Sequence, residues 1–138
     1  MWGQLMRSEF VIPKVLPPAI SWLKNHPDLA ALHGGRVSDE MNQTLPCLRV
    51  TVGFYLPANR WERKPVYQID AWGKTNGEAD SLGTMVANVW PDFKGTIGAA
   101  SIAGAWLHTD GPIPLRDPDT QLYRTMVQAA LEIHAGGF

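Results

Sequence analysis

The sequence predicts an α+β domain, in which a mostly antiparallel sheet of four to five strands carries two packed helices. Residues 47–54, 66–72 and 121–134 alternate between apolar and polar side chains, as strands do when one face of their sheet is buried. Near Gly73 the hydrophobic period changes from two to about 3.6, which predicts a central strand that leads directly into a helix. The length of 138 residues suits a single domain spanning residues 1–138.

The first forty residues are expected to supply one helix, a short helical turn and a short strand. Residues 1–12 are interpreted as an N-terminal arm held by scattered apolar anchors. Residues 17–24 predict a helix that opens with two prolines, because proline is tolerated in the first helical turn. Residues 27–32 suit a second helical turn that stops at the glycine pair 34–35, and residues 36–37 suit a short strand.

The strand at residues 47–54 leads into a long polar connection, residues 55–65, before the strand at 66–72 begins. This connection is expected to be an extended hairpin tip. It is longer than the usual hairpin loop, and long loops in compact domains tend to be functional or disordered. Residues 76–89 then show helical spacing, with Asn76 as the expected N-cap.

The last third of the chain adds two more strands and a second long loop. Residues 92–100 are rich in glycine and alanine and are expected to be a connector, followed by a strand at 101–110. Residues 110–121 form a loop rich in proline and aspartate. The apolar positions of 121–134 would also suit a helix, but the strand is favoured because the alternation is cleaner and the other strands need a partner.

The composition excludes several classes of protein. Thirteen acidic and twelve basic residues nearly cancel, which argues against a domain that mainly binds phosphate backbones. No apolar run of about 18 residues occurs, so no membrane span is expected. Charged residues and Pro13 interrupt any apolar core of a signal peptide. Cys47 is the only cysteine, which excludes an intrachain disulfide and is expected to be a buried, inert thiol.

The residues that could carry chemistry form no catalytic or metal-binding pattern, and no cofactor is predicted. The histidines fall in four separate elements without the spacing of a helical metal site: His26, His33, His108 and His134. No phosphate-binding loop or nucleophile motif is present. Asp70 and Glu78 could serve a small metal-dependent hydrolase, which stays an alternative. The simpler expectation is that Asp70 pairs across the sheet with Arg124 or Arg49.

The aromatic and basic residues instead point to an interaction surface. Six tryptophans in a chain of this size cannot all fit easily in one core, and surface aromatics often mark a protein interface. The 55–65 loop combines aromatic with basic residues, a pattern that suits a protein partner, a nucleic acid or an ordinary solvated loop. The candidate contact residues are Tyr55, Arg60, Trp61, Arg63, Lys64 and, from the second loop, Arg116.

Several short motifs, taken in order, resemble one family. After a first helix come the segment Leu45–Val50, the strand ending in Gln-Ile-Asp-Ala-Trp at 68–72, the helix entry Thr75–Ala79, an aspartate-rich loop, and Tyr123-Arg124 leading a final strand that ends at His134. Over residues 14–134 this order resembles the tail terminator, or tail completion, proteins of long-tailed bacteriophages. Neck proteins, which act as head–tail connectors, have similar small α+β layouts and stay an alternative.

The resemblance implies an assembly role without catalysis or cofactor. Such proteins form a ring, usually a hexamer, that caps the tail tube, stops its elongation and offers a surface to the head. The implied partners are further copies of the chain, the tail tube protein and the head–tail connector protein. DNA would only pass through the ring lumen, and no membrane is involved. The implied location is the head-proximal end of the virion tail, after assembly in the host cytoplasm.

Overall fold

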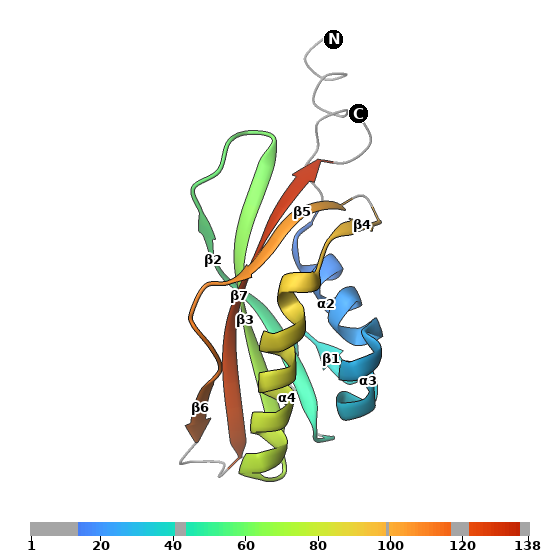
Figure 1. Ribbon diagram of the computed structural model, residues 1–138, viewed down its shortest axis with the longest axis vertical. Helices are drawn as coiled ribbons and strands as arrows, with labels where there is room; N and C mark the ends of the chain where they lie inside the picture. The colour runs from blue at the N-terminus through green and yellow to red at the C-terminus, as the bar shows by residue number, and fades with distance from the viewer. Residues whose placement is uncertain (1–13, 41–43, 99, 117–121, 136–138) are drawn as a thin grey trace.

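The sheet is built around β7 (Tyr123–Ala135), a strand of 13 residues. On one side β7 pairs along most of its length with β3 (Glu62–Gly73). On the other side it pairs with both β5 (Ala100–Leu107) and β6 (Ile113–Arg116). The computed structural model describes residues 14–40, 44–98, 100–116 and 122–135 (Figure 1). All statements on the structure concern these residues.

The remaining strands extend this centre on both sides. β2 (Cys47–Leu56) pairs antiparallel with β3, and the two-residue β1 (Val37–Ser38) pairs parallel with β2. β4 (Gly95–Ile97) lies antiparallel beside β5. The resulting order is β1-β2-β3-β7-β5-β4, with β6 also beside β7.

Three helices lie on one side of the sheet (Figure 1). They are α2 (Leu16–Asn25), α3 (Pro27–His33) and α4 (Asn76–Val89), and a 3₁₀ turn at Trp90–Asp92 continues α4. Among the described residues, no helix is long and apolar enough to cross a membrane.

The prediction of an α+β domain is confirmed, but the sheet is larger than predicted and mixed. Instead of four to five strands it has seven, with one parallel pair, β1 and β2, and there are three helices rather than the predicted two. The two unexpected strands, β4 and β6, lie in segments predicted as a connector and a loop. They have three and four residues, which is too short for an alternation of apolar and polar side chains to be recognised. In β6, Pro114 also argues against a strand, although proline is tolerated in a strand at the edge of a sheet.

The strand interpretation of residues 121–134 is confirmed by β7, since Tyr123–Ala135 are extended. Every second residue from Thr125 to Ile133 is buried on the helix side. The apolar positions of this segment also suited a helix, and the reason is that Ala130 is buried as well, on the opposite face of the sheet. Ala130 is buried there because the sheet curls: the Phe54 ring of β2 lies 5.1 Å from the ring of His108, which follows β5, although β3 and β7 separate these strands.

Helix α4 covers the predicted residues 76–89, but its N-cap is Thr75 rather than Asn76. Thr75 Oγ1 accepts a hydrogen bond from the Glu78 backbone N–H at 3.1 Å. The Glu78 carboxylate in turn accepts one from the Lys74 backbone N–H at 2.8 Å. This reciprocal arrangement is close to a capping box, which satisfies backbone donors that the first turn leaves free.

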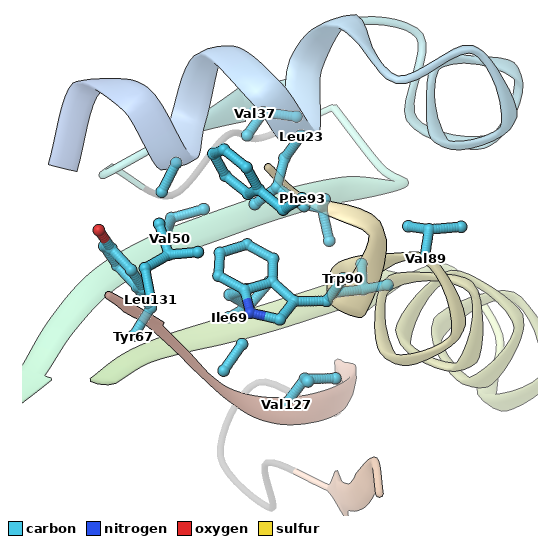
Figure 2. Packing of buried hydrophobic residues seen from close by; sticks show 14 of the residues in the cluster. Leu23, Val37, Val50, Tyr67, Ile69, Val89, Trp90, Phe93, Val127 and Leu131 are labelled. Atoms are coloured by element: carbon cyan, nitrogen blue, oxygen red, sulfur yellow. The ribbon is translucent and has the colours of Figure 1, made fainter. Parts of the chain in front are cut away.

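Trp90 is the centre of the hydrophobic core (Figure 2). Its ring is fully buried, and its indole N–H donates to the Ala130 carbonyl at 2.9 Å. Phe93 packs edge-on against Trp90 and stacks on Trp22 with ring centroids 4.5 Å apart. Tyr67 closes the other side, and its hydroxyl donates to the Val15 carbonyl. The core therefore joins α2, the end of α4 and the middle of the sheet.

The expected N-terminal arm, residues 1–12, lies outside the described residues, as do residues 117–121 of the second loop. The Leu45–Pro46 peptide bond before β2 is cis.

Candidate interaction surface

The β2–β3 hairpin carries five of the six predicted contact residues, but its loop is shorter than expected. β2 extends to Leu56 and β3 begins at Glu62, so only residues 57–61 connect the strands. Tyr55, Arg63 and Lys64 are therefore strand residues, paired in register with the opposite strand or with β7. The predicted loop at residues 55–65 is too long, because neither the end of β2 nor the polar start of β3 shows the alternation by which a strand is predicted.

The connection at the hairpin tip is ordered by its own side chains. Asn59 Oδ1 accepts a hydrogen bond from the Trp61 backbone N–H at 2.9 Å, a contact that favours a turn. The Arg60 guanidinium lies 4.6 Å from the centroid of the Trp61 ring. This cation–π contact places a positive charge beside an exposed aromatic ring.

Large apolar side chains gather along the outer part of this hairpin. Phe54, Tyr55 and Trp61 are 42%, 54% and 40% exposed, and these are three of the four large exposed hydrophobic side chains of the described residues. β1 pairs only with Leu48 and Arg49 of β2, and no other described strand covers the edge of β2 beyond them. The hairpin thus combines an open strand edge with exposed aromatic rings, both of which favour contact with another chain.

Arg116 does not join this group. It lies on β6, opposite Tyr123 at the start of β7, whereas Glu62 of the hairpin lies opposite His134 near the end of β7. Eleven residues of extended strand separate the two positions, or about 36 Å along the sheet. Arg116 lies 5.7 Å from the Tyr123 ring centroid, and the fourth exposed hydrophobic residue, Ile113, is on the same strand. The structure therefore divides the predicted residues between two separate edges.

A charged group of four residues lies next to the tip of the hairpin, where β3 begins, and the sequence did not predict it. His134 Nε2 is 3.3 Å from Glu62 Oε2 and 3.2 Å from Glu132 Oε2. Lys64 Nζ is 3.7 Å from Glu62 Oε1 and 3.6 Å from Glu132 Oε1. Only the register of β3 against β7 brings these residues together, because they are about 70 positions apart in the chain. We call Glu62, Lys64, Glu132 and His134 the charged quartet.

The other histidines have structural contacts, as their separate positions suggested. His33 is fully buried between Leu23 and Gly35: its Nε2 donates to the Leu23 carbonyl and its Nδ1 accepts from the Gly35 N–H, both at 2.9 Å. Burial lowers the pKa of His33, so the imidazole is neutral and matches these two bonds. His26 Nδ1 caps α3 by accepting from the Asp28 N–H.

Asp70 and Glu78, the carboxylates considered for hydrolysis, each have a structural contact. Asp70 is 2% exposed, and it accepts hydrogen bonds from Gln68 Nε2 at 3.1 and 3.3 Å. Arg124 Nη1 lies 3.9 Å away, the cross-strand pair that the sequence predicted. Burial raises the pKa of Asp70, while the Gln68 hydrogen bond and the charges of Arg124 and Arg49 oppose this rise. Glu78 caps α4, as described above.

No protein-family model matches this chain, and no curated protein matches its sequence. A solved structure does match: a chain of a particle described as the virion of a native gene transfer agent. The TM-score is 0.65 at 15% sequence identity, and the match covers 86% of this chain and 95% of that chain. The two chains therefore share a fold over nearly their whole lengths.

Proposed function

We propose that this chain is a structural protein of a phage-like virion, and within that class a tail terminator. In this role a ring of subunits, a hexamer in the family it resembles, caps the tail tube, stops its elongation and presents the head-joining surface. Two observations support the proposal. The sequence motifs follow the order found in terminators, and the fold is shared with a chain of a gene transfer agent virion.

The observation that carries the ring is the presence of two different open strand edges. A closed ring with head-to-tail contacts requires each subunit to present two unlike surfaces that fit one another. The first is β2 beyond Arg49, together with the exposed rings of Tyr55 and Trp61. The second is β6, which pairs on one side with β7 and on the other with no described strand. Strand edges can join by adding backbone hydrogen bonds across the interface.

The side chains at the two edges suit such a contact. Tyr55, Arg60 and Trp61 supply the residue types that most often dominate binding energies. Ile113 on β6 is 39% exposed and offers an apolar partner, and Arg116 adds a further cation. Lys64 and Arg63 sit next to the first edge and belong to the same proposed surface.

A head–tail connector, or neck protein, is the second candidate, favoured by the same fold and the same two edges. The two roles differ in what fails without the protein. Deletion of a terminator gives overlong or unstable tails, whereas deletion of a neck protein leaves complete tails that do not join heads.

The direct experiment is negative-stain microscopy of the purified chain, alone at high concentration and with polymerised tail tubes from the same particle. We expect rings in the first sample and tubes capped at one end in the second. A chain that stays monomeric and leaves tube growth unchanged would contradict the proposal. Rings that form alone but leave tubes uncapped would support the neck-protein role instead.

A further inference from the structure

The charged quartet has the donor atoms of a metal site. Glu62 and Glu132 each direct one oxygen at His134 Nε2, and one ligand atom from each of the three residues lies within 4.8 Å of the others. One imidazole nitrogen and two carboxylate oxygens are ligands that Zn²⁺ accepts in proteins. The three residues thus offer three protein ligands in one place.

The separations of the two carboxylate oxygens from His134 Nε2 are close to those around a tetrahedral ion. For metal–ligand bonds of about 2.0–2.2 Å, two ligands of a tetrahedral ion lie about 3.3–3.6 Å apart. The Nε2–oxygen separations are 3.3 and 3.2 Å. His134 Nε2 is itself inaccessible to solvent, yet neither contact has hydrogen-bond geometry and no described atom accepts or donates a hydrogen bond there. This nitrogen is therefore close to both carboxylates without a hydrogen bond to either.

We propose that Glu62, Glu132 and His134 bind a divalent transition-metal ion of the Zn²⁺ type. The His134 side chain is 46% exposed, so the three ligands lie at the molecular surface, where water can supply a fourth ligand, although Nε2 itself faces the two carboxylates. The bound ion would tie the start of β3 to the end of β7 and so fix the tip end of the hairpin.

Lys64 stays in place when the ion binds, because it contacts the other oxygen of each carboxylate. Its positive charge repels a cation bound by the same two carboxylates. The charges of the two glutamates and Lys64 sum to −1 before the ion binds. Substitution of Lys64 therefore distinguishes two interpretations of the charged quartet. A metal site does not need the lysine, whereas a network held together only by ion pairs does.

The test is calorimetric titration of the untagged full chain with Zn²⁺ near neutral pH. We expect one equivalent to bind. His134→Ala should weaken this binding at least about tenfold, since even outer-shell groups are worth that much. Glu132→Gln, a nearly isosteric change at a half-exposed position, should do the same and covers the case in which His134→Ala does not fold. His108→Ala removes an exposed imidazole outside the charged quartet and is the matched control, with unchanged binding.

Lys64→Gln should bind Zn²⁺ more tightly than the wild type, because a like charge has been removed next to the ion. Zn²⁺ should also raise the Tm of the wild type and of His108→Ala, but not of Glu132→Gln. Absence of Zn²⁺ binding by the wild type, binding that His134→Ala and Glu132→Gln leave intact, or weaker binding by Lys64→Gln would each overturn the proposal. The Zn²⁺ measurements do not depend on ring formation, so the metal site and the proposed function are tested separately.

Discussion

Gly83 is the residue at which α4 comes closest to the sheet. A Cβ atom placed on Gly83 would lie 2.5 Å from Thr125 Cγ2 and 2.9 Å from Thr125 Cβ, both closer than real contacts allow. Thr125 is fully buried and its branched side chain cannot turn away. The glycine costs helix propensity at this position, and the close packing of helix and strand explains why it is tolerated.

Gly83→Ala should therefore destabilise the protein by about 1–3 kcal/mol, the range for overpacked cores, despite the better helix propensity of alanine. Urea unfolding measures the change. Gly77→Ala is the matched control, because a Cβ at Gly77 meets nothing within 4 Å, and it should stabilise by about 0.5–1 kcal/mol. Adding Thr125→Ala to Gly83→Ala should cost less than the two single changes together, and strict additivity would contradict the contact.

Asp70→Asn should change how stability depends on pH. Because burial raises the pKa of Asp70, the folded state binds this proton more tightly than the unfolded state. The stability gained is fully present below the unfolded pKa and is lost as pH rises through the raised folded pKa. The variant has no such loss. Its free energy of unfolding, minus that of the wild type, should increase from about pH 3 to about pH 7. A difference that stays constant or decreases would show that the folded pKa is not raised.

In the β2–β3 hairpin, a substitution can impair the proposed ring assembly without lowering the stability of the fold. Trp61 is 40% exposed at the tip, so Trp61→Ala should change the free energy of unfolding by less than about 1 kcal/mol. It should still abolish or strongly weaken ring formation, because exposed tryptophans at interfaces can contribute about 2 kcal/mol or more to each contact. Size-exclusion chromatography with light scattering measures assembly, and urea unfolding measures stability.

Thr84→Ala on the exposed side of α4 is the control for Trp61→Ala, since it lies on the helical layer away from both strand edges. It should affect neither measurement. If the Trp61→Ala variant forms rings as readily as the wild type, the hairpin tip is not part of the subunit contact.

The long elements were predictable from the sequence because their packing imposes a regular pattern. Residues 47–54, 66–72 and 121–134 were predicted as strands, and 76–89 as a helix, since each buries one face over several residues. The short strands β4 and β6 were not predictable, because they are defined by their neighbours β5 and β7 rather than by their own residues. The same holds for residues 55–56 of β2 and 62–65 of β3, which show no alternation of their own and continue the pairing begun in the core.

The candidate surface was predictable only in part, for a related reason. Tyr55, Arg60 and Trp61 are close in sequence, so their composition alone drew attention to them. The charged quartet depends on which residues of β3 and β7 lie opposite one another, and a strand register cannot be read from one strand. The alternating pair Glu132 and His134 was the one available signal, as two polar residues on the same face of a strand.

The whole molecule offers a direct test of how subunits meet. If the β2 edge of one subunit contacts the β6 edge of the next, the double variant Tyr55→Cys/Ile113→Cys should form disulfides between subunits under oxidising conditions. Non-reducing gel electrophoresis should then show a ladder that ends at the ring size. Each single variant should give dimers at most. Cys47 is fully buried and needs no removal. Dimers alone from the double variant would exclude a head-to-tail contact at these edges.

The central position of β7 also governs the order in which the chain can acquire its structure during synthesis. β7 pairs with β3, β5 and β6, yet it is the last of the seven strands to be translated. Until it emerges from the ribosome, β3 has an exposed edge and Trp90 lacks the Ala130 carbonyl. A nascent chain halted before β7 should therefore be a target for chaperones and proteases. Ring assembly, which would use edges on both sides of β7, cannot begin before translation of this strand is complete.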